Sequence, residues 1–353
     1  MRVLLFVNDH ETKEQTGYKR PFRDLMNAGL ISEFVCLSPG LRLDRGASIT
    51  DTQAEIIHAV KSLRPDVVFI MHPHNMGFNN RLLSMMRSIC NFKLILWEGD
   101  GYSLLRKQPS RSDLAVARYA DVIYTVGKGS FRKNFLLYGA KDVRWVPHCF
   151  ETDRIPALDK VDLSKGNFKH DVVAILNKSL HTFRPAKNWR DRRDFVELGQ
   201  LTFGDRFAVY GSGWSGTGAK GRISFDEQYV AVSEARVSAN WDHYAKQPWY
   251  FSDRLPISLA SGSVHATTFH PGYDQIFGPS TSDFLLLEST PQRLIARINK
   301  FLQDTSDEKI MEYRLRARDF AYNNFRQDDW IVKMLNYDQE NVSLEAARQS
   351  WSK

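Results

Sequence analysis

The sequence predicts an α/β protein built from two doubly wound domains that face a central cleft. Short apolar, β-branched runs alternate with segments of helical spacing, which is typical of a parallel sheet covered by helices on both faces. The alternation stops at residues 150–170, which are charged and lack periodicity, and then begins again. A length of 353 residues also favours two domains over one.

The first predicted domain covers residues 1–155. Its first expected strand, residues 2–7, is apolar from Val3 to Val7, as expected for a strand that is buried on both faces. The expected strands are residues 2–7, 33–37, 67–71, 93–97, 122–126 and 143–146, and the expected helices are residues 19–28, 49–63, 81–90, 114–119 and 131–138.

Residues 156–170 are the predicted linker, and residues 171–337 form the second domain. The tail, residues 338–353, is expected to pack back on the first domain. A cleft between two such domains is the usual place for a ligand. The second domain's expected strands are residues 172–176, 206–210, 236–240, 264–268 and 283–287, and its expected helices are residues 189–201, 226–234, 253–261, 291–302, 308–325 and 328–337, with another beginning near Asp274.

The composition indicates a basic, cytoplasmic protein. The net charge of +7 and a pI near 9.2 suit a polyanionic partner, such as nucleic acid, an anionic membrane face or a phosphorylated donor. Many basic enzymes bind no polyanion beyond their substrate, and that alternative stays open. No apolar run reaches the ~18 residues that a membrane span needs. Cys36, Cys90 and Cys149 lie far apart, which indicates a reducing compartment.

The stretch 248–278 organises the second domain. Ser252 and Asp253 can begin a helix, because their side-chain oxygens can accept hydrogen bonds from free backbone N–H groups, and Gly262 can end it. Arg254 lies in the first turn, where it could reach an anion at the helix N-terminus. The alternative is an ordinary buried helix with Arg254 on its surface.

This stretch resembles the Arg-x-x-Glu-x-x-Ala-x-Gly signature of GT-B glycosyltransferases. Arg254, Ala260 and Gly262 match it, and His270-Pro271-Gly272 follows, as in the spore-maturation-type family. The tract is similar, more loosely, to the β-glucosyltransferase that phages use on hydroxymethylated DNA. The resemblance implies two Rossmann-like domains, the second of which binds a nucleotide sugar. Ile257 stands where the family has a glutamate that grips the donor ribose.

A basic loop, residues 177–193, follows the first strand of the second domain. Lysine and arginine there can clamp a diphosphate, because guanidinium binds phosphate oxygens bidentately. The resembling phage loop supports Lys178 and Arg184 as donor-binding residues. For Arg190, Arg192 and Arg193, on the next helix, we expect a solvated face.

Two further tracts are expected to border the donor. Gly211 opens a G-x-G-x-x-G run that no apolar helix continues, so we interpret it as a wall of the donor pocket and not as a NAD site. The resemblance to the phage enzyme implies that the backbone of Ile223 meets the nucleotide base. A hydrophobic staple packed on the following helix is the alternative.

Ser252 and the turn His270 to Tyr273 complete the expected donor-binding set. Gly272 would let the backbone approach a ligand closely. His270 could donate to a phosphate or a sugar hydroxyl, and a histidine bonded locally is an equal alternative.

The acidic tract 97–102 ends a strand of the first domain. Inverting glycosyl transfer needs a carboxylate that takes the proton of the acceptor hydroxyl. The comparison with the phage enzyme implies Asp100 as that base, with Glu98 second and Asp9 or His10 in reserve. An Asx-type turn is the alternative.

His72-x-His74 invites a metal assignment, but zinc needs at least three ligands and no partner has convincing spacing, so no metal and no cofactor are expected. The predicted activity is transfer of a sugar, with a UDP-sugar as the expected donor. The signature lacks the two glutamates common in retaining relatives, which suggests an inverting outcome.

The expected acceptor is a hydroxymethylated pyrimidine of double-stranded DNA, with Arg106, Lys107 and Trp145 helping the base leave the stack. The alternatives are a cell-surface glycan, lipid or spore component, or an inactive binding module. We expect a monomer or a weak dimer.

Overall fold

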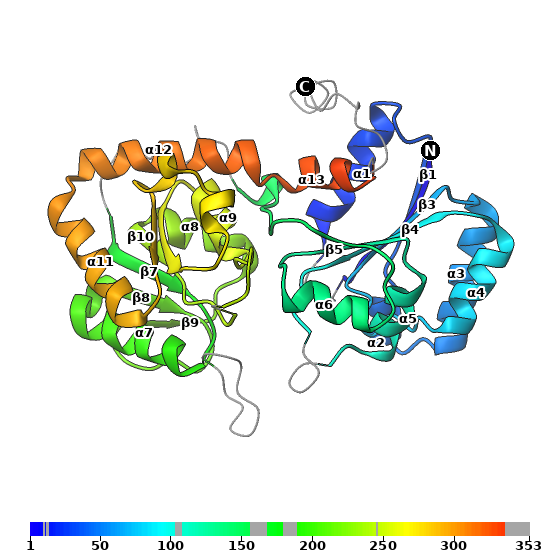
Figure 1. Cartoon of the computed structure of the whole chain (residues 1–353), viewed down its shortest axis with the longest axis horizontal. Coiled ribbons are helices and arrows are strands. Elements are labelled where there is room, and N and C mark those ends of the chain that lie inside the picture. The colour runs from blue at the N-terminus through cyan, green and yellow to red at the C-terminus, as the bar shows by residue number, and fades with distance from the viewer. Residues whose placement is uncertain are drawn as a thin grey trace. The chain divides into compact units, whose positions relative to one another are not determined.

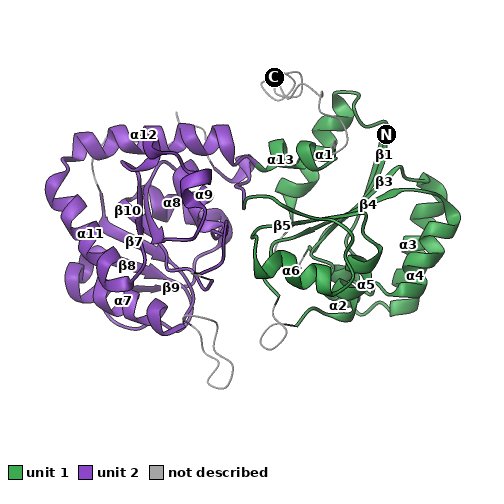
Figure 2. Cartoon of the chain, viewed as in Figure 1, with its two compact units in different colours: residues 1–147, 327–353 green, residues 148–326 purple. Residues whose placement is uncertain are grey.

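The computed structural model describes residues 1–9, 11, 14–102, 108–155, 168–178, 189–244 and 246–335. The chain divides into two compact units, one of residues 1–147 with 327–353 and one of residues 148–326 (Figure 2). Each unit contains a six-stranded parallel sheet with helices packed around it (Figure 1). The predicted pair of doubly wound α/β domains is thus confirmed.

The N-terminal unit has the strand order β2-β1-β3-β4-β5-β6. Its strands are β1 (Arg2–Phe6), β2 (Glu33–Leu37), β3 (Val67–Met71), β4 (Lys93–Glu98), β5 (Val122–Thr125) and β6 (Val143–Trp145). Its helices are α1 (Thr16–Asn27), α2 (Pro39–Asp44), α3 (Ile49–Leu63), α4 (Asn80–Ile89), α5 (Arg111–Tyr119), α6 (Ser130–Leu137) and α13 (Gln327–Leu335). Every residue of β3 is buried, as expected for a central strand covered on both faces.

The C-terminal unit has the strand order β12-β11-β10-β7-β8-β9. Its strands are β7 (His170–Ile175), β8 (Phe207–Tyr210), β9 (Ala219–Gly221), β10 (Ala235–Ala239), β11 (Val264–Thr268) and β12 (Leu285–Glu288). Its α-helices are α7 (Trp189–Phe203), α8 (Gln228–Ser233), α9 (Arg254–Ala260), α10 (Tyr273–Ile276), α11 (Pro291–Asp304) and α12 (Asp307–Asn324). Every predicted strand lies within two residues of an observed one. The short α2 and β9 were not predicted, because neither has enough residues to show a period.

Helix α13 belongs to the N-terminal unit, whereas the sequence assigned it to the second domain. It packs on α1, and the ring of Trp330 meets that of Trp145 edge-on at 6.1 Å between centroids. Most of the predicted linker and the whole tail, residues 338–353, lie outside the described residues. In the part of the chain that the structure describes, no helix is both long and apolar enough to cross a membrane.

A glycine inside α7 permits the close approach of this helix to β8. A Cβ on Gly199 would lie 2.4 Å from the ring of Phe207, which is fully buried between Phe195 and Phe203. Alanine would favour the helix by about 1 kcal/mol, but overpacking a filled core costs roughly 1–3 kcal/mol.

The difference between the two effects is roughly 0–2 kcal/mol, so we expect Gly199→Ala to lower the free energy of unfolding by about 1 kcal/mol, as measured by urea denaturation. Gly278→Ala is the matched control in the same unit, because its Cβ would meet only Ser280 Oγ at 3.9 Å and its φ of −69° suits alanine. Equal stability of the two variants would contradict this account of the α7–β8 contact.

Candidate functional site

The carboxyl edge of the N-terminal sheet gathers acidic and imidazole side chains. Because the strands are parallel, the residues that follow β1, β3 and β4 lie at the same edge. Asp9 follows β1, His72 follows β3, and Glu98 and Asp100 close β4.

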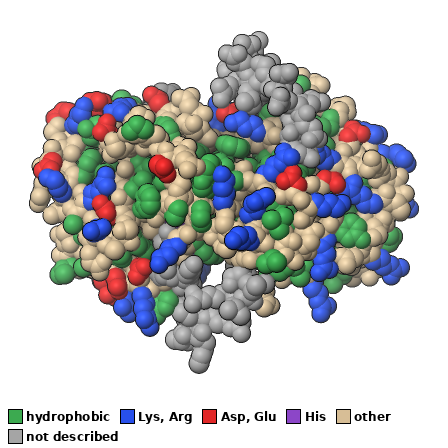
Figure 3. All heavy atoms as spheres, viewed as in Figure 1, with side chains coloured by type: hydrophobic (Ala, Val, Ile, Leu, Met, Phe, Trp, Pro, Cys, Tyr) green, Lys and Arg blue, Asp and Glu red, His purple; other side chains and the backbone are tan. Residues whose placement is uncertain are grey.

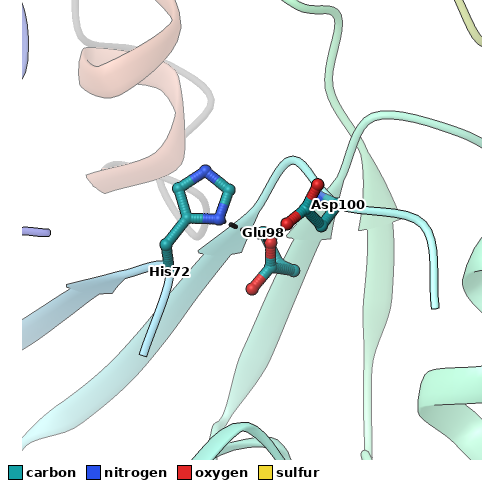
Figure 4. Close-up of side chains that lie close together, drawn as sticks. All are labelled: His72, Glu98 and Asp100. Carbon is teal, nitrogen blue, oxygen red and sulfur yellow. Dashed lines mark hydrogen bonds and ion pairs between the residues drawn. The ribbon is translucent and has the colours of Figure 1, made fainter. Parts of the chain in front are cut away.

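Glu98 is the centre of this group (Figure 4). Its side chain is 1% exposed. Its Oε1 lies 2.6 Å from His72 Nδ1 and accepts the backbone N–H of Asp100 at 2.9 Å. Its Oε2 accepts the hydroxyl of Tyr102 at 3.0 Å. Glu98 therefore contacts His72, Asp100 and Tyr102 at once. Because its carboxylate is buried, it is less accessible to an acceptor hydroxyl than Asp100 is.

Asp100 remains the acidic side chain of this tract that solvent reaches. The Asp100 N–H donates to the side chain of Glu98, two residues earlier. An Asx-type turn, the alternative for this tract, has a side-chain bond of the same span. The contact of His72 with Glu98 could not be predicted from the sequence, because the two residues are 26 positions apart. The spacing of His72 to His74 pointed to a different pair. His74 points elsewhere, since its Nδ1 lies 3.4 Å from Asp113.

The reserve candidate Asp9 is occupied by internal contacts. Lys19 Nζ lies 2.7 Å from its carboxylate, and the Ser38 hydroxyl and the Gln15 N–H also donate to it. Burial alone would raise the pKa of Asp9, but these hydrogen bonds outweigh burial and hold the pKa below its ordinary value. His10, the other reserve, lies outside the described residues.

His72, Glu98 and Asp100 offer potential metal-ligand atoms within 4.8 Å of one another. The separation of 2.6 Å between His72 and Glu98 is that of a hydrogen bond. A cation would have to replace that bond, so the present arrangement is a hydrogen-bonded cluster and not a coordination sphere. No metal assignment follows from it.

The carboxyl edge of the C-terminal sheet carries cationic groups. Arg254 begins α9, and its Nε donates to the carbonyl of Ile175 at the end of β7, at 2.5 Å. Asp253 Oδ1 lies 3.1 Å from its Nη1. The helix begins and ends as predicted, but neither Ser252 nor Asp253 caps it with a side-chain oxygen, because Ser252 is buried and accepts from Asn240.

Arg192 is a buried arginine, which corrects the expectation of a solvated face on α7. Its Nε donates to the Trp241 carbonyl at 2.8 Å, and its Nη1 lies 3.4 Å from the Asn177 carbonyl and 2.6 Å from His243 Nε2. Burial and the nearby charge of Arg254 lower its pKa to about 9. Periodicity did not reveal this residue, because arginine seldom faces a core.

Two guanidinium groups thus affect each other at one edge of a parallel sheet. Among the described residues, the hydrogen-bond partners of Arg192 are two carbonyls and an imidazole, with no carboxylate. Burial destabilises the charged form of an arginine, and an anion that binds beside it stabilises that form. This edge therefore suits a polyanionic ligand such as a diphosphate.

Lys178 lies beside the glycine turn that follows β8. Its N–H donates to Ser212, and its Nζ lies 5.6 Å from the centre of the Trp214 indole. Gly211 has a φ of 141°, and a Cβ there would lie 2.0 Å from the Leu176 carbonyl oxygen. The turn needs glycine because the ends of β7 and β8 meet there. Arg184 lies outside the described residues.

The turn after β11 is part of a buried polar network. His270 Nε2 lies 3.0 Å from Asp242 Oδ2, and its Nδ1 lies 3.1 Å from the Gln247 carbonyl. His270 is 0% exposed and Asp242 is 1% exposed. Both ring nitrogens therefore serve the fold, through partners 23 and 28 residues away and not through the local bond considered as the alternative.

Neighbouring residues of the predicted donor set are also packed into the fold. Tyr273 is buried between Phe251 and Phe277. Gly272 has a φ of 92°, and a Cβ there would lie 2.3 Å from the indole of Trp249, so the close approach is made by a side chain of the protein.

Ile223 packs against a small core that includes Ala231 and Val232 of α8. This contact matches the alternative of a hydrophobic staple. Ile257 is 8% exposed and lines the same hollow as Arg254, so this position offers no carboxylate to a ribose.

The fold has known counterparts. No protein-family model matches the sequence, and no curated protein matches it. Solved structures do match over nearly their whole length. Sucrose-phosphate synthase from Thermosynechococcus elongatus is 12% identical with a TM-score of 0.59, over 96% of this chain and 98% of that one.

HepE from Anabaena in complex with UDP-glucose is 14% identical with a TM-score of 0.56, over 100% of both chains. A mutant of the T4 phage BGT in complex with UDP-glucose is 12% identical with a TM-score of 0.58, over 97% of this chain and 100% of that one. The chain has the GT-B fold. The narrower resemblance to spore-maturation-type proteins stays a prediction.

The buried Asp242–His270 pair yields a stability test. Burial raises the pKa of Asp242, but the bond to His270 and the charges of His270, Arg192 and Arg254 outweigh it and hold the pKa below its ordinary value. We expect Asp242→Asn to lower the free energy of unfolding at pH 7 by about 3 kcal/mol.

A carboxylate with a depressed pKa stabilises the fold above its unfolded pKa, and that contribution is lost as the pH falls through the folded pKa. The difference between wild type and Asp242→Asn should therefore shrink on acidification, as followed by denaturation at several pH values. Asp274→Asn is the control on an exposed carboxylate. A loss no larger than that of the control would contradict the assigned role of Asp242.

Proposed function

We propose that this protein is a glycosyltransferase that takes a sugar from a nucleotide diphosphate. The observation that carries the proposal is the pair Arg192 and Arg254 at the carboxyl edge of the C-terminal sheet, in a chain with the GT-B fold. HepE and the T4 phage BGT, which share the fold, have been crystallised with UDP-glucose, and this supports a UDP-sugar as the donor.

The C-terminal unit would bind the donor. Arg254 and Arg192 would neutralise the diphosphate as negative charge develops on it in the transition state, and Lys178 would add a third cation. The proposal also includes Arg184, which would contact the phosphates as the resemblance implies. Gly211, Ile223, Ser252, His270, Gly272 and Tyr273 would then shape the pocket through the packing described above.

The N-terminal unit would bind the acceptor. The acceptor oxygen attacks the anomeric carbon, the bond from that carbon to the diphosphate breaks, and the hydroxyl proton moves to a base of the protein. A single displacement of this kind inverts the anomeric configuration. Asp100 is the base that the resemblance to the phage enzyme implies, and Glu98 would hold it in place by accepting its backbone N–H. The proposal includes no metal and no cofactor.

The charge distribution favours a polyanionic acceptor. The N-terminal unit, residues 1–147 with 327–353, contains 24 Lys and Arg against 19 Asp and Glu, a net charge of +5, and residues 148–326 contain 24 against 22, a net charge of +2. Figure 3 shows lysine and arginine side chains spread over the N-terminal unit on the face drawn. Hydroxymethylated pyrimidines in DNA fit this charge. A surface glycan, lipid or spore component is the second candidate, and an inactive binding module is the third.

Donor binding should stabilise the protein. At a concentration ~100 times its Kd, a ligand specific to the native state adds about 2.7 kcal/mol. We expect one of the UDP-, GDP- or TDP-sugars to raise the Tm by several degrees, and Arg254→Ala to remove the shift.

Arg293→Ala is the matched control, since Arg293 is an exposed arginine in the first turn of α11 in the same unit. Unchanged donor binding in Arg254→Ala would remove Arg254 from the site, and no response to any nucleotide sugar would overturn the proposed donor class.

A DNA acceptor predicts binding that weakens steeply with salt, because each neutralised phosphate contributes about −0.9 to the slope of log K against log salt concentration. The slope can be measured by fluorescence anisotropy with duplexes that contain 5-hydroxymethylcytosine. Incubation with the stabilising donor should then add one sugar mass to the duplex. Absence of both effects would exclude DNA and favour the surface-glycan alternative.

A further inference from the structure

Helix α6 of the N-terminal unit ends in two exposed leucines. Leu136 is 39% exposed and Leu137 is 71% exposed, whereas Phe131 and Phe135 of the same helix are buried in the core. A single exposed apolar side chain is ordinary on a protein surface, but adjacent ones leave apolar area in water that a partner can cover.

Four exposed cationic side chains border these leucines, namely Arg118, Arg132, Lys133 and Lys141. Two of them lie on α6 one turn before the leucines, where residues four positions apart share a face. Arg118 comes from α5, which lies beside α6 (Figure 1), and its Nε donates to the Tyr138 carbonyl at the end of α6, at 3.3 Å. Lys141 lies in the short connection from α6 to β6. The two leucines and the four cations are called the α6 patch below.

The positive charge of the α6 patch is not neutralised by the protein. Within the described part of the chain, none of its four cations makes an ion pair. Residues 122–141 contain no Asp or Glu. The acids that flank this range are bonded to other arginines, since Asp121 lies 2.7 Å from Arg87 and Asp142 lies 2.8 Å from Arg144. The α6 patch is therefore complementary to an anionic surface.

The combination of leucines with cations distinguishes between anionic partners. The cations are attracted to the negative surface potential of anionic lipid headgroups. The leucines leave water when they enter the boundary between headgroups and acyl chains. The phosphate backbone of duplex DNA would bind the same cations, but it offers no apolar layer to the leucines. The α6 patch therefore fits a lipid surface better than it fits nucleic acid.

We infer that the α6 patch attaches the N-terminal unit to the surface of an anionic lipid bilayer. Leu136 and Leu137 enter the headgroup boundary, and the four cations contact lipid phosphates. The attachment is peripheral, because only the end of one short helix enters the lipid. This interaction goes beyond the proposed sugar transfer, since none of the residues of the patch belongs to the proposed donor site or to the acidic cluster.

Flotation of the full-length protein with lipid vesicles measures this attachment. We expect binding to vesicles of equal parts phosphatidylglycerol and phosphatidylcholine, and no binding to vesicles of phosphatidylcholine alone. Binding should weaken at high salt, because salt screens exposed charges. Absence of binding to the phosphatidylglycerol vesicles would overturn the inference.

Two substitutions test the two parts of the patch. Leu137→Gln should weaken vesicle binding by a factor of about ten or more, which corresponds to the burial of one leucine side chain. Leu201→Gln is its matched control, because Leu201 is 82% exposed on α7 in the C-terminal unit. Lys133→Glu should weaken vesicle binding about tenfold. Its control is Lys61→Glu, an exposed position on α3 of the same unit. A wild-type Tm shows that each variant is folded.

The same variants separate a lipid surface from nucleic acid. Leu137→Gln should leave the affinity for duplex DNA at its wild-type value. Wild-type vesicle binding in Leu137→Gln, together with a loss of both vesicle and DNA binding in Lys133→Glu, would overturn the inference and identify the patch as a nucleic-acid contact. The donor-induced rise in Tm should be the same in every variant, so a failure of the donor screen concerns the proposed function alone.

Discussion

Parallel hydrogen bonding between strands is the constraint on which the rest of this molecule depends. In each unit every strand runs in the same direction, so all carboxyl ends, and the loops after them, lie at one edge. This arrangement brings residues far apart in the sequence, such as His72 and Glu98, to the same edge of a sheet. The helices contribute mainly by burying both faces of the sheets, which leaves the edges for polar side chains.

The two units share one kind of side-chain contact. Each has a buried carboxylate paired with an imidazole, Glu98 with His72 and Asp242 with His270. In the C-terminal unit His270 is completely enclosed and both of its nitrogens are engaged, so the pair supports the loops around it. In the N-terminal unit only the carboxylate is enclosed, and the ring is partly exposed. The two pairs therefore differ in the exposure of the imidazole, while the carboxylate is buried in both.

The sequence was sufficient for the architecture because every strand except the three-residue β9 contains an apolar run that can be recognised. It was insufficient for the site, since the decisive contacts join residues that no short-range pattern connects. Arg192 shows this limit: helical spacing cannot tell an arginine that donates to carbonyls of a neighbouring loop from one in water. His270 and Gly272 lay in a recognisable motif, yet their nearest partners are Asp242 and Trp249, which the motif does not contain. Glu98 was named among the acids, but its burial could not be read from the residues beside it.

The contact between Trp249 and Gly272 has a consequence for motion. Both residues have left-handed backbone angles, the Trp249 N–H donates to the Pro271 carbonyl, and the indole fills the space where a side chain at position 272 would be. The segment that leads into α9 and the turn after β11 are therefore interlocked, and neither can shift without the other. A ligand that displaces one of these segments would therefore have to displace the other as well.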